Sequence, residues 1–192
     1  MAAGLPPATR PFAGAVLTGG QSLRMGRDKA LLPIDGRPMA ALAADVLRGA
    51  GAVPVVAIGG DAVALTAIGL DVVPDLHPGD GPLGGLLTAF EALGDHELVA
   101  VVATDLPAVT PAVVASLVAA IGHDDAVFAA TDDRLEPMCG VWRVETCRAV
   151  LGRAFSDGER AVHRAVASLA HHTVPVPVPL LRNVNEPDDL AR

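Results

Sequence analysis

Short segments in which almost every residue is apolar recur along this chain, and they constrain its fold more than any other sequence feature. Segments of this kind are typical of strands in a parallel sheet, which is buried on both faces, whereas a half-exposed strand alternates apolar and polar residues. Five segments are predicted to be strands: residues 12–18, 53–58, 70–73, 98–103 and 126–131. Four segments between them are predicted to be helices from their amphipathic pattern, caps, prolines and glycines: residues 38–49, 61–68, 82–93 and 111–121.

Strands that alternate with helices in this way predict an α/β fold, in which helices cover both faces of a parallel sheet. The second half of the chain is less regular. Its predicted elements are a strand at 138–142, helices at 145–151 and 159–169, an extended segment at 173–179 and a terminal helix at 188–191. Three prolines restrict the segment 173–179 to a sheet edge. No repeat or linker divides the chain, so we expect one domain over residues 1–192, with residues 1–11 as a flexible tail.

The composition excludes several classes of protein. The residues are 51% hydrophobic and 19% charged, which excludes an intrinsically disordered chain. The net charge of −8 argues against a general nucleic-acid or anionic-membrane binder, because both need a basic surface. The most apolar stretch, residues 98–121, contains Asp105 and two prolines, so we do not expect it to span a membrane. Cys139 and Cys147 are too few for a disulfide framework, and we expect reduced thiols in a cytoplasmic protein.

Ligands of parallel α/β sheets bind at the carboxyl ends of the strands, so the residues that follow the predicted strands are the first candidates for a site. The segment 17–29, LTGGQSLRMGRDK, follows the first strand directly. Its glycines allow close approach to a ligand, and its backbone N–H groups are suited to phosphate oxygens. Arg24, Arg27 and Lys29 place three cations within six residues, and Lys29 is the only lysine of the chain. The alternative interpretation is a solvated surface loop.

Two aspartates follow other predicted strands. Asp105, in the sequence ATDLP, is placed to bind Mg²⁺, which takes one or two carboxylates together with substrate phosphates. Asp75 follows the strand 70–73. For each aspartate the alternative is a turn or cap beside a neighbouring proline. The glycine-rich segment 78–85 is interpreted as a binding loop that leads into a helix N-terminus, and its alternative is a plain turn.

Motifs for other chemistries are missing from the sequence. The segment 17–29 is neither a Walker P-loop nor a dinucleotide-binding fingerprint, and the chain has no nucleophile elbow. The six histidines form no ligand spacing with carboxylates. Asn183 and Asn185, the only asparagines, stand together after the last extended segment.

These motifs resemble those of a known family. The segment 17–32, LTGGQSLRMGRDKALL, is similar to the nucleotide-binding signature of the molybdenum cofactor guanylyltransferases. Further elements follow in the family's order: GPLGG at 81–85, Asp105 and Pro107, DGER at 157–160, and NVNEPDDL at 183–190. The resemblance covers nearly the whole chain, and its first and last motifs are the specific ones.

The resemblance implies a Rossmann-like, three-layer α/β/α nucleotidyltransferase fold with a mostly parallel sheet. It also implies the Mg²⁺-dependent transfer of GMP from GTP to the terminal phosphate of molybdenum-molybdopterin, which yields the guanine dinucleotide cofactor and pyrophosphate. GTP and molybdenum-molybdopterin are then the partners of the chain, and a transient contact with molybdoenzyme chaperones stays open. No nucleic acid and no membrane are expected.

The resemblance also assigns roles position by position. The residues assigned to catalysis are Arg24, Lys29 and Asp105, with Asp105 as the metal ligand. The residues assigned to the nucleotide are Leu17, Thr18, Gly19, Gly20, Lys29, Asp75, Gly81, Pro82, Leu83 and Asp105. Asn183 and Asn185 are assigned to the pterin side of the cleft. A general base is not required, because the attacking phosphate is already an anion.

Other positions bear on the choice of nucleotide. Gly19-Gly20 favours GTP, because cytosine-using relatives carry Ala-Gly at these positions. The chain departs from the family at Thr18, where alanine is usual, at Thr104, where cysteine is frequent, and at Gly59-Gly60, where some members have a nucleotide-binding asparagine. The alternatives are a molybdopterin cytidylyltransferase, another nucleotidyltransferase, or a non-catalytic module that binds pterin or nucleotide.

Overall fold

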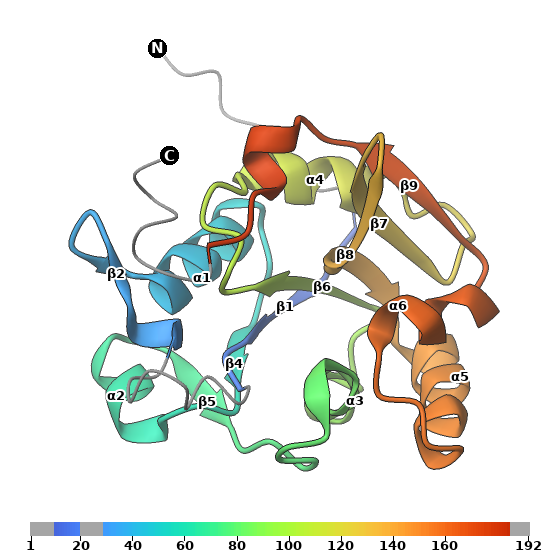
Figure 1. The fold of residues 1–192 in the computed structure, drawn as a ribbon, viewed down its shortest axis with the longest axis horizontal. Coiled ribbons are helices and arrows are strands. Elements are labelled where there is room, and N and C mark those ends of the chain that lie inside the picture. Colours follow the sequence, from blue (N-terminus) through green and yellow to red (C-terminus); the bar gives the residue numbers. More distant parts are fainter. Residues whose placement is uncertain (1–9, 20–28, 185–192) are drawn as a thin grey trace.

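The computed structural model describes residues 10–19 and 29–184, and its centre is one seven-stranded sheet with helices on both faces (Figure 1). The strand order is β5-β4-β1-β6-β8-β7-β9. The strands are β1 (Ala13–Leu17), β4 (Val55–Ile58), β5 (Asp71–Val73), β6 (Leu98–Ala103), β7 (Ala126–Thr131), β8 (Arg134–Arg143) and β9 (His171–Pro175). The five apolar segments predicted to be strands are therefore β1, β4, β5, β6 and β7.

Most of the strand pairs are parallel, as predicted. β1 lies between β4 and β6 and is parallel to both, β5 continues the sheet beside β4, and β9 pairs in parallel with β7. β8 is antiparallel to both of its neighbours, β6 and β7. Only two residues, Asp132 and Asp133, join β7 to β8, and so short a connection forces the two strands to run in opposite directions.

The helices divide between the two faces of the sheet (Figure 1). The helices are α1 (Met39–Gly49), α2 (Ala62–Ala67), α3 (Gly81–Ala92), α4 (Pro111–Ala120), α5 (Val144–Ser156) and α6 (Val162–Ala165). One core contains the buried side chains of α1, α2 and α4, and the other contains those of α3, α5 and α6. Alternate residues of β1 enter opposite cores, Val16 the first and Leu17 the second, because successive side chains of a strand point to opposite faces. The predicted three-layer architecture is confirmed.

Several predicted boundaries are corrected. β8 begins at Arg134 rather than at residue 138, because hairpin pairing with β7 recruits the polar residues after the turn. α5 extends the helix predicted at 145–151 in both directions. The predicted extended segment 173–179 is β9 up to Pro175, at the sheet edge as expected, followed by the 3-10 helix η4 (Val178–Leu181). The segment 81–85 is not a loop, because α3 begins at Gly81.

The helix predicted at 159–169 is wrong in its first turn. α6 begins at Val162 and is followed by the 3-10 helix η3 (Val166–Ser168). The Glu159 carboxylate accepts hydrogen bonds from the backbone N–H groups of Arg160 and Ala161, both at 2.8 Å. Such local bonds between a side chain and the backbone compete with helix formation, so the helix starts after them.

A 3-10 helix η2 (Lys29–Leu31) and a small hairpin of β2 (Pro33–Ile34) and β3 (Arg37–Pro38) were not predicted. Cys139 and Cys147 are free thiols, as expected. Both are buried, and burial raises the pKa of each thiol to about 12. Across residues 10–19 and 29–184, no helix is both long and apolar enough to cross a membrane. The predicted helix 188–191 and most of the predicted tail 1–11 lie outside the described residues.

The close packing of β8 on β7 yields a stability prediction. A Cβ atom at Gly140 would lie 2.6 Å from Phe128 Cδ1 and 3.0 Å from the Val127 carbonyl oxygen. Gly140→Ala should therefore cost about 1–3 kcal/mol by overpacking, which lowers the Tm by about 2–12 °C. Gly152→Ala is the matched control, because a Cβ at this α5 position meets nothing within 4 Å. This control should gain about 0.5–1 kcal/mol from helix propensity. Equal Tm values for the two variants would contradict the packing described.

Candidate active site

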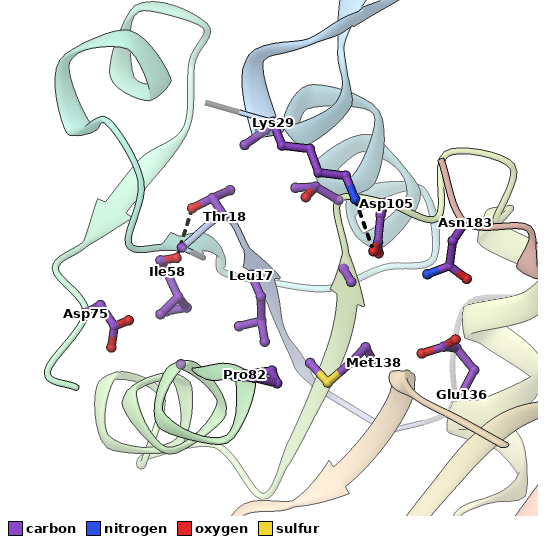
Figure 2. A pocket seen from close by; sticks show the side chains of 15 residues that line it. Leu17, Thr18, Lys29, Ile58, Asp75, Pro82, Asp105, Glu136, Met138 and Asn183 are labelled. Atoms are coloured by element: carbon purple, nitrogen blue, oxygen red, sulfur yellow. Dashed lines mark hydrogen bonds and ion pairs between the residues drawn. The ribbon is translucent and has the colours of Figure 1, made fainter. Parts of the chain in front are cut away.

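A cavity of about 300 Å³ opens at the carboxyl ends of β1, β4 and β6, where the sequence predicted a site (Figure 2). The sheet register brings these ends together, because Leu17 pairs with Ile58 on one side and with Ala103 on the other. Eight of the predicted site residues line the cavity: Leu17, Thr18, Gly19, Lys29, Asp75, Pro82, Asp105 and Asn183. We call it the first cavity.

Other predicted site residues are placed elsewhere. Gly81 lines a neighbouring cavity rather than the first one. The side chain of Leu83 is completely buried in the core beneath α3, so this side chain does not reach the first cavity. Gly20, Arg24 and Asn185 lie outside the described residues, as does Arg27.

The end of β1 is fastened to the end of β4. The backbone N–H groups of Thr18 and Gly19 both donate to the Ile58 carbonyl oxygen, at 3.1 and 2.9 Å. The Thr18 hydroxyl lies 2.9 Å from the same oxygen and 2.8 Å from the Gly59 carbonyl oxygen, and it donates to one of them at a time. These two amides are therefore engaged within the sheet. What Thr18 and Gly19 offer a ligand is surface and carbonyl oxygens rather than unbonded N–H groups.

Gly59 lies where three segments come closest together. Its φ is +73°, in the left-handed region that favours glycine. A Cβ atom there would lie 3.1 Å from the Gly19 Cα and 3.3 Å from the Asp75 Cβ. The absence of a side chain at Gly59 therefore lets the residues after β1, β4 and β5 meet. This packing gives a structural reason for glycine where some family members have an asparagine.

Lys29 and Asp105 form an ion pair across the top of the first cavity (Figure 2). Lys29 Nζ lies 3.4 Å from Asp105 Oδ2, and the two side chains are 18% and 27% exposed. Asp105 follows β6, and its carbonyl oxygen accepts a hydrogen bond of 2.9 Å from the Val184 N–H. That bond holds the neighbouring Asn183 at the cavity. The Asn183 Oδ1 atom is buried and has no hydrogen-bond partner among the described residues.

Glu136 and Met138 also line the first cavity, and the sequence reasoning missed both. Both residues belong to β8, which is antiparallel to β6. The start of β8 therefore lies at the same edge of the sheet as the end of β6. The Glu136 side chain is 12% exposed and lies 3.2 Å from an Arg134 nitrogen. Burial raises the pKa of Glu136 above its usual value, the Arg134 charge lowers it, and the negative charge of Asp105 raises it further. The only sequence signal for these residues was the short acidic turn between β7 and β8.

A second cavity, of about 580 Å³, adjoins the first one, and the two share Pro82, Glu136 and Met138. Arg160, Arg164 and His163 lie on its wall. The Arg160 guanidinium is held at 3.9 Å over the Phe155 ring, and its Nε donates to Asp80 Oδ1 at 3.1 Å.

Arg164, on the same wall of the second cavity, makes two hydrogen bonds of 2.7 Å to Glu159. The hydrogen bonds from Arg164, with those from the backbone, lower the pKa of Glu159 to about 2. Within the DGER motif at 157–160, Arg160 thus lines the second cavity, and the Glu159 carboxylate orients Arg164, which lines the same cavity.

The carboxylates of the first cavity limit how a metal ion could be held. Within residues 10–19 and 29–184, no group of three or more His, Cys, Asp or Glu side chains is arranged to bind one. Three carboxylates line this cavity, those of Asp75, Asp105 and Glu136. Asp105 and Glu136 are close enough for the charge of Asp105 to raise the pKa of Glu136. Mg²⁺ binds readily through one or two carboxylates when substrate phosphates and water complete its coordination. The residues therefore fit a cation that arrives with a phosphate substrate.

Comparison with known proteins adds independent information. The sequence model of one family, described as the MobA-like NTP transferase domain, matches residues 14–174. A molybdenum cofactor guanylyltransferase of Rhodobacter capsulatus is 35% identical over 191 residues, which cover 94% of each chain. A protein of the same name from Xanthomonas euvesicatoria pv. vesicatoria is 40% identical over 130 residues, which cover 68% of this chain and 64% of that protein.

Solved structures with the same fold support the architecture. A molybdopterin-guanine dinucleotide biosynthesis protein A from Archaeoglobus fulgidus superposes with a TM-score of 0.74 at 24% identity, over 93% of this chain and 95% of that chain. A nucleotidyl transferase from Methanothermobacter superposes with a TM-score of 0.79 at 18% identity, over 94% of each chain. At these identities the similarity concerns the fold alone.

The buried carboxylate of Glu136 yields a pH-dependent prediction. The pKa of Glu136 is raised in the folded state, so the folded protein binds this proton more tightly than the unfolded chain does. As the pH rises above the unfolded pKa near 4.5, ionisation of Glu136 therefore lowers the free energy of unfolding. Glu136→Gln should therefore raise the Tm at pH 7 by about 2–4 °C, which corresponds to about 1 kcal/mol. The gain should vanish near pH 4, where glutamate is neutral as well. A lower Tm for the variant at pH 7 would mean that the Arg134 ion pair outweighs the desolvation.

Proposed function

This chain belongs to the MobA-like NTP transferase family, and from that premise we propose that it transfers GMP from GTP to the terminal phosphate of molybdenum-molybdopterin. The products would be the molybdopterin guanine dinucleotide cofactor and pyrophosphate. The observation that carries the proposal is the Lys29–Asp105 pair, which sits in the first cavity at the carboxyl ends of β1 and β6. The names of the Rhodobacter and Xanthomonas relatives support guanylyl transfer in particular.

The first cavity is the proposed nucleotide site. Leu17, Thr18 and Gly19 would lie against the base, and Asp75 would bind the nucleoside part. Lys29 would bind the phosphates, because its ammonium group enters the cavity beside Asp105. Pro82 belongs to the same wall, and Gly81 borders it from the second cavity. Leu83, with its side chain in the core, would act by packing α3 rather than by touching the nucleotide. Gly20 and Arg24 keep the roles that the family resemblance gives them.

Asp105 is the proposed ligand of Mg²⁺, and Glu136 is the second carboxylate nearby. When bound, the ion would supply positive charge that offsets the negative charge building up on the phosphates in the transition state. Lys29 would orient the Asp105 carboxylate before the nucleotide arrives. The fit rests on the partly exposed Asp105 carboxylate in a cavity with room for phosphates.

The proposed reaction needs positioning and charge stabilisation more than acid–base chemistry. An oxygen of the acceptor phosphate would bond to the α-phosphorus of GTP, and the bond from that phosphorus to the bridging oxygen of pyrophosphate would break. The nucleophile is an anion, so a base is not needed. Lys29 and Arg24 would stabilise the departing pyrophosphate by their positive charge.

The second cavity is the proposed place of the acceptor. It adjoins the first cavity along Glu136 and Met138, so molecules bound in the two cavities would meet there. Arg160 and Arg164 are suited to a phosphate group. Asn183 lines the first cavity rather than the second, and its Oδ1, which has no partner among the described residues, would accept a hydrogen bond from an N–H group of a pterin that reaches the junction of the two cavities. Asn185 is proposed for the same side on the family resemblance.

Nucleotide-dependent thermal unfolding tests the proposed specificity. A ligand at 100 times its Kd stabilises a protein by about 2.7 kcal/mol, so GTP with Mg²⁺ should raise the Tm by about 5–10 °C. CTP, ATP and UTP should raise it less. A larger shift with CTP would favour the cytidylyltransferase alternative. The absence of a shift with any nucleotide, in a protein shown to be folded, would favour the non-catalytic binding module.

Removal of the Asp105 carboxylate tests the catalytic assignment. Asp105→Ala should lower kcat/KM at least about 100-fold, which corresponds to about 2.7 kcal/mol of transition-state stabilisation. The measurement is pyrophosphate release with GTP, Mg²⁺ and molybdenum-molybdopterin. Asp95→Ala is the matched control, because Asp95 is exposed and precedes β6, at the opposite end of the strand from Asp105. Asp95→Ala should leave the rate unchanged, and full activity in Asp105→Ala would refute the assignment.

A further inference from the structure

Thr88 is a buried polar residue that the proposed chemistry does not use. It lies within α3, its exposure is 0%, and apolar side chains of the same helix surround it in sequence. A buried hydroxyl costs free energy unless it forms hydrogen bonds, and valine would have almost the same shape at lower cost. The contacts of the hydroxyl therefore need an explanation beyond packing.

The Thr88 hydroxyl connects α3 to the segment after β5. It accepts a hydrogen bond of 3.1 Å from the Leu76 N–H. As a donor it has two acceptors within reach, the Gly84 carbonyl oxygen at 3.0 Å and Asp75 Oδ1 at 3.1 Å. A threonine that served only its own helix would need the Gly84 carbonyl alone. The other two contacts are directed at Asp75 and the residue after it.

The Oδ1 atom of Asp75 has a second hydrogen-bond donor. Asp75 Oδ1 also accepts a hydrogen bond of 2.9 Å from the His77 N–H. α3 packs tightly enough on this segment for the contacts to form, because a Cβ atom at Gly84 would lie 2.7 Å from the His77 Cβ. One carboxylate oxygen of Asp75 is thus engaged by the protein through Thr88 and His77.

The other oxygen of Asp75 faces the nucleotide side. A Cβ atom built at Gly19 would lie 3.5 Å from Asp75 Oδ2, so this oxygen borders the end of β1. Gly19 and Asp75 both line the first cavity. A carboxylate held by one oxygen presents the other in a defined direction, and an ionised carboxylate can only accept hydrogen bonds. The complementary ligand group is an N–H or O–H donor.

We propose that Thr88 is a positioning residue, whose buried hydroxyl holds Asp75 Oδ1 so that Oδ2 accepts a hydrogen bond from the nucleoside part of the bound nucleotide. The donor is a ribose hydroxyl or an amine or imine N–H of the base. This inference rests on the proposed function, because it requires a nucleotide in the first cavity. Thr88 acts before the reaction, by orienting Asp75, and therefore affects binding of the nucleotide rather than the rate of its transfer.

The test compares two substitutions that differ in the hydroxyl. Thr88→Val removes the hydroxyl and keeps the shape, and it should raise the Kd for GTP with Mg²⁺ about tenfold in calorimetric titration, or about 1.4 kcal/mol. Thr88→Ser keeps the hydroxyl and should bind GTP within about threefold of the wild type. The KM for GTP should rise in Thr88→Val while kcat at saturating GTP and the KM for the acceptor stay unchanged. Ser116→Ala is the control, because the Ser116 hydroxyl bonds only to the Val113 carbonyl of α4 within the part of the chain that the structure describes.

A double-mutant cycle separates positioning from a structural effect. If Thr88 acts through Asp75, Thr88→Val should have no further effect on the Kd in an Asp75→Ala background. An equal loss in both backgrounds, or unchanged GTP binding in Thr88→Val, would overturn the inference while the proposed function stands. Failure of the wild-type protein to bind any nucleoside triphosphate would overturn both. If Thr88→Val does not fold, as judged by Tm, Thr88→Ala replaces it in the same cycle.

Analogues then identify the donor. Titration of the wild type and Asp75→Ala with 2′-deoxyGTP, 3′-deoxyGTP, ITP and the triphosphate of 2-aminopurine riboside removes one ribose hydroxyl, the base amine or the base imine N–H at a time. The analogue that lacks the true donor should bind the two proteins with the same Kd, whereas GTP should favour the wild type. A preference for the wild type that is equal for GTP and all four analogues would overturn the assignment of Oδ2 to a nucleoside donor.

Discussion

The parallel pairing of β1 with β4 and β6 is the constraint on which the remaining structure depends. It sets Leu17 beside Ile58 and Ala103, so that the three strands end at one level of the sheet. The Ile58 carbonyl oxygen accepts hydrogen bonds from the N–H groups of both Thr18 and Gly19, and these bonds connect the end of β1 to the end of β4. The polar residues that follow these strands lie beyond the paired positions of the sheet, and they line the same cavity.

This arrangement explains why so apolar a sheet can carry a charged site. Hydrophobic burial on both faces stabilises the strands, which leaves the ends of the strands as the part of the sheet where charge can remain partly hydrated. Lys29 and Asp105 offset each other's charge there. Glu136 is the exception, because burial raises its pKa, and its charge is therefore held at a cost to stability. Groups that cost stability at a cavity are expected where they serve a ligand.

Much of the site could be predicted because it follows strands that are recognisable from hydrophobicity alone. Gly19, Asp75 and Asp105 each come within two residues after the end of an apolar segment, and in a parallel sheet such positions gather at one edge. Glu136 and Met138 could not be found in this way, because they stand at the beginning of an antiparallel strand. Thr88 gave no signal either, since its partners Asp75 and Leu76 lie about a dozen residues away in sequence and meet it only through the packing of α3.

The sequence by itself determined which five apolar segments form the core strands, that most of the sheet is parallel, and at which edge of the sheet the first cavity would open. Hydrophobic periodicity and chain connectivity are local properties, and they carry that information. Only the tertiary structure decided the roles of the amides and carboxylates at that edge. In that structure the Thr18 and Gly19 amides donate to the Ile58 carbonyl oxygen, and Glu136 lines both cavities. One oxygen of Asp75 accepts a hydrogen bond from the His77 N–H. These outcomes depend on distances between segments that are far apart in the chain, and such distances arise only when the sheet and helices pack.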